Sequence, residues 1–80
     1  MPNLSKNRQD PVLLALGHAI RRIRLAKEIS QENLALLAEV DRSYVGRVER
    51  GDNNVAILTL SKLAFAMNIT LVELMQEAGL

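Results

Sequence analysis

The sequence contains no cysteine and only one histidine among its 80 residues. Without cysteine, neither disulfide bonds nor thiol chemistry can contribute, and the composition suits a cytosolic setting. The single His18 leaves no cluster of side chains suited to bind zinc. The chain also lacks a Gly-rich phosphate loop and a nucleophile paired with a histidine. We therefore expect no metal, no cofactor and no enzymatic activity.

Long apolar runs are also missing from the chain. No stretch approaches the roughly 18 consecutive apolar residues of a membrane span, and the opening MPNLSKNRQDP is not typical of a signal peptide. These features predict a cytoplasmic protein. Eighty residues suffice for one small domain and are too few for two. Because residues 1–9 are polar and aperiodic, we expect a disordered N-terminal arm over 1–9 and one domain over 10–80.

Helical periodicity is present in most of the remaining sequence, and no segment alternates in the way that a strand does. Capping residues stand before four of the five expected helices: Asp10, Ser30, Asp41 and Thr70. Thr70 also has the spacing of a capping box with Glu73. Together these signals predict an all-α fold, a compact bundle of five short helices. They run over about 11–26, from 31 to no further than 39, and over 42–50, 57–67 and 71–78.

Charge is unevenly distributed along the chain. Residues 21–50 carry seven basic and five acidic side chains, whereas residues 51–80 carry one basic and three acidic. A basic middle and an acidic end indicate two different functional surfaces.

The predicted helix over 42–50 has an apolar face and a basic face. At 100° per residue, one side takes Tyr44, Val45 and Val48, and the other takes Arg42, Ser43, Gly46, Arg47 and Arg50. The planar guanidinium group of arginine suits bidentate contact with guanine or with phosphate oxygens. Tyr44 lies at the border of the two faces, where its hydroxyl could reach a phosphate or its ring could pack against the preceding helix.

Gly46 interrupts this helix at a cost of about 1 kcal/mol relative to alanine. Because it lies between Arg42 and Arg50 on the basic face, a missing side chain there would let the helix lie closer to a ligand. The alternative is that Gly46 is merely tolerated.

The segment SQENLALLAEVDRSYVGRVERG resembles the helix-turn-helix of the Cro and lambda-repressor family, also called the XRE family. The matching residues are Gln31, Leu34, Ala35, Ser43, Tyr44, Glu49 and Gly51. LSKLAFAMNITLVEL resembles the fourth helix and the start of the fifth in that family. The resemblance covers about residues 12–77 and is greatest to small single-domain regulators, including restriction–modification controller proteins.

This resemblance implies that 42–50 is the recognition helix, with base contacts from Arg42, Ser43 and Arg47. Backbone phosphate contacts would come from Gln31 and, downstream, from Arg50, Asn53 and Asn54. It also implies a structural ion pair between Arg24 and Glu49, which would orient the recognition helix. The one departure in the turn is Glu39, at a position where the family often has glycine and where φ tends to be positive.

The predicted fourth helix is more apolar than one core face requires. Leu58 and Phe65 are seven residues apart and therefore share one side, and Val72 and Met75 are neighbours on the next helix. Left in water, these four residues would form an association surface. Alternatively, Phe65 folds back onto the core.

Taken together, these residues and the resemblance predict a sequence-specific regulator of transcription. We expect it to bind double-stranded DNA as a homodimer on a palindromic operator, with the helix over 42–50 in the major groove. The alternative is a protein-interaction module of the same fold, such as an antitoxin or an adaptor.

Overall fold

Local signals determine where the longest helix begins. In the computed structural model, which describes residues 9–80, α1 (Pro11–Ala26) starts where the Asp10 carboxylate accepts a hydrogen bond from the Val12 N–H at 2.9 Å. Pro11 occupies the first helical turn, where its missing N–H is not needed. The predicted bounds of this helix are confirmed.

The corner between α2 (Gln31–Ala38) and α3 (Arg42–Glu49) also follows the sequence. The Ser30 hydroxyl accepts a hydrogen bond from the Asn33 N–H at 3.0 Å and so begins α2. Glu39 ends α2 in the left-handed region, with φ of +61°. A non-glycine residue there costs roughly 1–2 kcal/mol, and the tight turn into α3 requires that conformation.

Four details of the helix ends differ from the prediction. Asp41 stands at the cap position of α3, but its side chain makes no capping hydrogen bond. The helix ends at Glu49 rather than Arg50, and α4 (Ile57–Ala66) ends one residue before Met67. Each extra residue instead occupies the C-cap, where the chain already leaves the helix. Helix α5 (Leu71–Glu77) likewise ends one residue before Ala78, but it has the complete capping box that was predicted.

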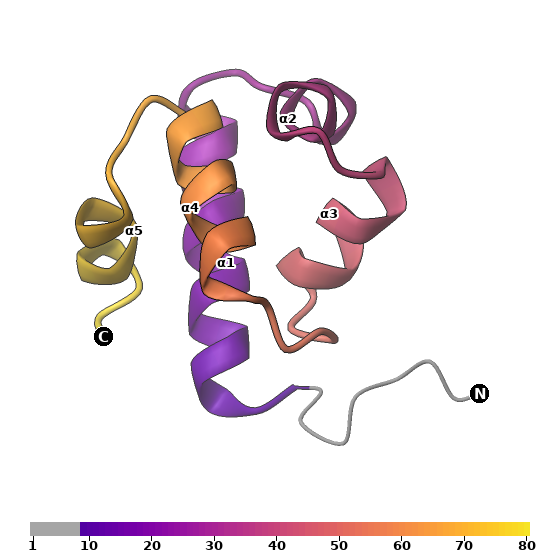
Figure 1. Cartoon of the computed structure of the whole chain (residues 1–80). Coiled ribbons are helices and arrows are strands. Elements are labelled where there is room, and N and C mark those ends of the chain that lie inside the picture. Colours follow the sequence, from indigo (N-terminus) through magenta and orange to yellow (C-terminus); the bar gives the residue numbers. More distant parts are fainter. Residues whose placement is uncertain (1–8) are drawn as a thin grey trace.

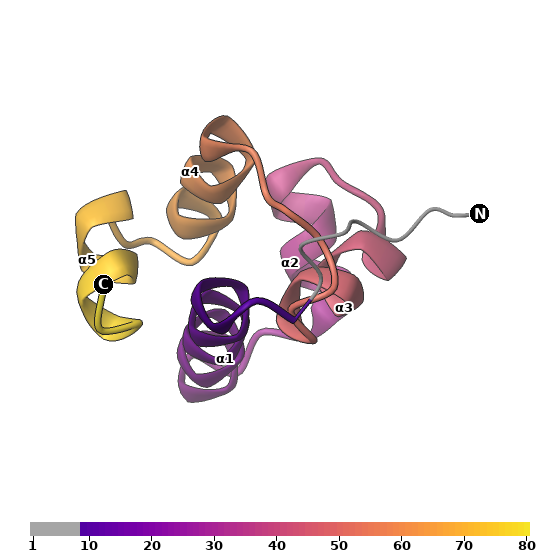
Figure 2. The ribbon, with the colours of Figure 1, turned by 90° about the horizontal axis from the view of Figure 1, so that it is seen from below.

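The helices surround a single apolar core. Figure 2 shows α5 on one side of α1 and the α2–α3 corner on the other, with α4 across from α1. Helix α1 packs on α3 and α5, and α4 packs on α2 and α5. The largest fully buried side chains come from every part of the bundle: Ile20, Leu34, Val45, Leu63, Met67 and Leu74. The all-α prediction is therefore confirmed over residues 9–80 (Figure 1).

The chain enters the domain beside the end of α3. The Gln9 N–H donates to the Gly51 carbonyl oxygen, and the Gln9 side chain donates to Asp52 at 3.3 Å. Residue 9, the last of the predicted arm, thus has hydrogen-bond partners in the loop after α3. The remainder of the predicted arm, residues 1–8, lies outside the described residues.

Among residues 9–80, no single helix has the length and apolar composition of a membrane span. Helices α4 and α5 have the necessary length and apolar composition only when they are taken together, and they meet at a bend of 91°.

Candidate nucleic-acid interface

Helix α3 lies directly against the backbone of α1. Gly17 makes this possible, because a Cβ atom built there would lie 2.5 Å from the carbonyl oxygens of both Val48 and Glu49. Real side chains do not approach backbone so closely. The glycine therefore sets the distance between α1 and the last turn of α3.

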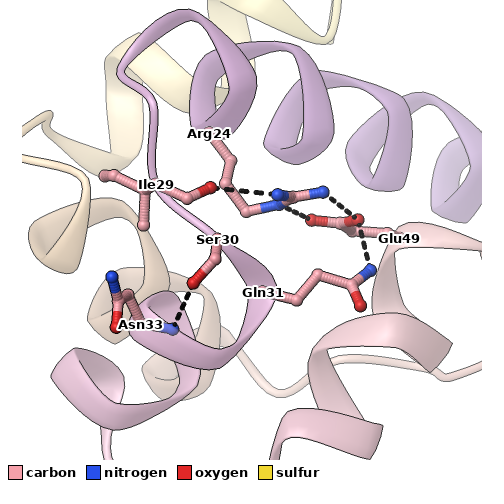
Figure 3. Close-up of polar contacts among 6 residues, drawn as sticks. All are labelled: Arg24, Ile29, Ser30, Gln31, Asn33 and Glu49. Carbon is pink, nitrogen blue, oxygen red and sulfur yellow. Dashed lines mark hydrogen bonds and ion pairs between the residues drawn. The ribbon is translucent and has the colours of Figure 1, made fainter.

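About two turns further along α1, a buried ion pair fixes the orientation of α3 (Figure 3). The Arg24 Nε donates to Glu49 Oε2 at 2.6 Å, and Nη2 donates to Oε1 at 3.1 Å. The third nitrogen, Nη1, donates to the Ile29 carbonyl oxygen at 3.0 Å. Arg24 is only 6% exposed and Glu49 5%. This bidentate geometry supports the structural role expected for the pair.

Gln31 joins this network from the first turn of α2. Its Nε2 donates to Glu49 Oε1 at 2.9 Å, so the side chain links α2 to the ion pair between α1 and α3. Gln31 was predicted to contact phosphate. Since one amide proton already belongs to Glu49, only the rest of the half-buried amide remains for a ligand.

The outer face of α3 is basic, as the helical spacing predicts. Arg42, Ser43 and Arg50 are exposed, and Arg47 is half-buried. The Arg47 Nη1 lies 3.5 Å from the Ser43 hydroxyl, and its guanidinium carbon lies 5.8 Å from the centre of the Tyr44 ring. Contact with the aromatic face favours an ordered guanidinium group. Tyr44 itself is half-buried and packs against the core.

Gly46 does not lie bare on this face, which corrects the reason proposed for it. The residue is buried, and a Cβ atom built there would lie 3.3 Å from Arg50 Nη1 and 4.0 Å from the Gln31 amide. The ends of two polar side chains thus lie above the position that a side chain of residue 46 would occupy. Glycine at this position therefore leaves room for Gln31 and Arg50.

The loop after α3 brings together the predicted downstream residues. Gly51 adopts φ of +78° and packs against Leu14 of α1, so it is required both for its conformation and for its size. Arg50 Nε lies 3.2 Å from Asp52 Oδ2. Asn53 is half-buried and Asn54 exposed. The loop is thereby held beside the C-terminal end of α3.

A second surface is apolar and lies on α4 and α5. Phe65 is 83% exposed, Leu58 74% and Val72 64%. The alternative in which Phe65 folds back onto the core is therefore wrong, because Leu63, Ala64 and Met67 already fill that space. Met75 is half-buried against the core and contributes only its outer part to the surface.

Sequence reasoning missed Gly17 and Gln9. Gly17 lies four residues after Leu13 and three before Ile20, on the apolar stripe of α1. A glycine on the inward face of a helix is a signal of close backbone approach. Gln9 carries no comparable signal, because its partners are 42 or more positions away in the sequence.

A family model described as helix-turn-helix matches residues 20–74, which is more than half of the chain. That range begins within α1 and ends within α5.

Two curated relatives are control proteins. Control protein C.SmaI of Serratia marcescens is 38% identical over 65 residues, covering 81% of this chain and 77% of that protein. Control protein C.MunI of Mycoplasma sp is 31% identical over 67 residues, covering 82% of this chain and 90% of that protein.

A solved structure extends the likeness to three dimensions. The restriction-modification controller protein C.AhdI from Aeromonas hydrophila superposes with a TM-score of 0.76 at 50% identity. The match covers 78% of this chain and 94% of that one.

Proposed function

The chain belongs to the helix-turn-helix family of DNA-binding transcription regulators, and from this premise we propose that it binds a palindromic operator as a homodimer. Helix α3 enters the major groove of each half-site. The family consists of regulators rather than enzymes. The relatives named as control proteins support a role in controlling transcription. The protein would act in the cytoplasm, by occupying a DNA site near a promoter.

One observation carries this proposal: the buried Arg24–Glu49 pair holds α3 with its basic face outward. Direct reading of bases in the major groove requires a rigid helix whose side chains reach base edges. We assign base contacts to Arg42, Ser43 and Arg47. Gly46 lies between them, beneath the ends of the Gln31 and Arg50 side chains, and adds no side chain of its own to this face.

Residues around α3 supply the contacts to the backbone. We assign phosphate contacts to Gln31, Tyr44, Arg50, Asn53 and Asn54. Gln31 lies at the N-terminus of α2, where the helix dipole favours an anion. The Arg50 side chain is 63% exposed, and we expect it to exchange its half-buried partner Asp52 for a phosphate. Such contacts position the protein without specifying sequence.

Alanine substitutions should separate the two kinds of contact. Arg42→Ala and Arg47→Ala should each weaken binding to the preferred site by about 1–3 kcal/mol and relax the preference at one base pair, because bidentate contacts to a base are lost. Arg50→Ala should weaken binding to all sequences alike. Fluorescence anisotropy on the operator and on its single-base variants measures both effects. If all three variants lose the same affinity on every sequence, the assignment of base contacts to Arg42 and Arg47 is contradicted.

The exposed apolar surface supports the dimer. Leu58, Phe65 and Val72 are exposed on α4 and α5, and a second copy could cover them together with part of Met75. A two-fold axis through this patch would present two copies of α3, and a palindrome with half-sites about 34 Å apart requires such a pair.

Charge placed in this patch should therefore separate the protomers. We expect the double variant Phe65→Glu with Val72→Glu to sediment as a monomer at micromolar concentration and to bind the operator weakly, since burying a carboxylate in an apolar interface is costly. The matched control is Leu36→Glu with Leu37→Glu, which alters two exposed leucines of α2 and should leave the dimer intact. A folded Phe65–Val72 variant that remains dimeric would place the interface elsewhere.

Selection of bound duplexes from a random pool at physiological salt tests the function itself. Enrichment of a palindrome supports an operator-binding regulator. If only sequence-independent, salt-sensitive binding is found, the protein-interaction module becomes the better explanation.

A further inference from the structure

Two neighbouring arginines of α1 have different surroundings. Arg22 Nη2 donates to the Glu77 carbonyl oxygen at 2.8 Å and so joins α1 to the end of α5. Arg21 instead lines a hollow of about 500 Å³, together with Arg24, Ser30, Gln31, Glu32 and Arg42. The hollow thus lies where α1, the start of α2 and the start of α3 meet.

The charges around this hollow favour an anion. Arg24 donates from all three nitrogens to Glu49 and Ile29, so its charge is already matched. Arg21 and Arg42 are exposed and form no hydrogen bond or ion pair within residues 9–80. Against these two guanidinium groups stands a single carboxylate on the rim, that of Glu32. The rim therefore carries a net positive charge that no internal partner uses.

We propose that this hollow holds one backbone phosphate of duplex DNA and that Arg21 is the residue of α1 that binds it. The inference rests on the proposed function. A DNA phosphate suits the site because Arg42, on the hollow's rim, is also the first residue of α3. A phosphate there would belong to the strand bordering the groove that α3 enters. Arg21 then fixes how deeply α3 can enter.

The test compares two alanine variants that remove the same charge from adjacent positions. On the operator selected above, Arg21→Ala should bind about tenfold more weakly per protomer, the size of one lost charge-assisted hydrogen bond. The slope of log affinity against log salt should fall by about 0.9 per protomer. Arg22→Ala should change neither quantity appreciably, and Arg21→Lys should restore most of the affinity because it keeps the charge. Circular dichroism checks that each variant is folded.

Neutral methylphosphonate groups, placed one at a time along the operator, locate the phosphate. Several positions should weaken binding of the wild-type protein and of Arg22→Ala. At one of these positions in each half-site, Arg21→Ala should be unaffected. The proposal is overturned if Arg21→Ala and Arg22→Ala behave alike, or if Arg21→Ala responds to every methylphosphonate as the wild type does. Failure of the wild-type protein to select any operator would overturn the proposed function instead, so the two failures are distinguishable.

Discussion

Gly17→Ala should destabilise the domain by about 3 kcal/mol. The added methyl group would lie 2.5 Å from two carbonyl oxygens of α3, and neither can move without moving the helix. Helix propensity alone predicts the opposite sign, because alanine in place of glycine stabilises a helix by roughly 1 kcal/mol. Urea denaturation followed by circular dichroism measures the change. We also expect weaker operator binding from any folded fraction, since α3 would be displaced outward.

Gly46→Ala provides a matched control in the same domain. There the added methyl group would meet only the ends of the Arg50 and Gln31 side chains, at 3.3 Å and 4.0 Å. Flexible side chains can move by a few tenths of an ångström, so this variant should be as stable as the wild type or slightly more stable. Equal stability of Gly17→Ala and Gly46→Ala would show that α1 and α3 are not in backbone contact as described.

Glu49→Ala should cost about 3–5 kcal/mol, because it leaves the buried guanidinium of Arg24 without its counter-charge. For a small domain this is a large part of the total free energy of unfolding, which is typically about 5–15 kcal/mol. The same substitution also removes the acceptor for Gln31. Urea denaturation should therefore give a midpoint far below that of the wild type.

The double variant Arg24→Met with Glu49→Leu separates the charge from the packing. Apolar replacements remove both buried charges together, so most of the loss seen in Glu49→Ala should disappear. Operator affinity should nevertheless fall, because the bidentate contact that orients α3 and positions Gln31 is gone. If the double variant is as unstable as Glu49→Ala, the unmatched charge is not the cause.

Helix positions could be predicted from the sequence because the interactions that determine them are short in range. Asp10 and Ser30 accept hydrogen bonds from N–H groups two and three residues ahead, and Thr70 with Glu73 caps the last helix. Apolar spacing likewise depends only on the helical repeat. The small errors, such as the end of α3 at Glu49, arise where the last turn unwinds into a loop.

The basic face of α3 and the ion pair were also predicted, but for different reasons. The face follows from the positions of Arg42, Arg47 and Arg50 along a helix. The pairing of Arg24 with Glu49 came from resemblance to a family, because residues 25 positions apart have no local signal for contact.

The five helices, their inward stripes and the arginines of the outer face of α3 thus follow from the order of the residues alone. Three features follow only from how the helices pack: Gly17 lies against the backbone of α3, Gln31 and Arg50 cover Gly46, and Phe65 is exposed. Periodicity specifies the direction of a side chain from its own helix axis. What that side chain meets depends on the distance and angle of the next helix, and these are set by packing among residues far apart in the chain.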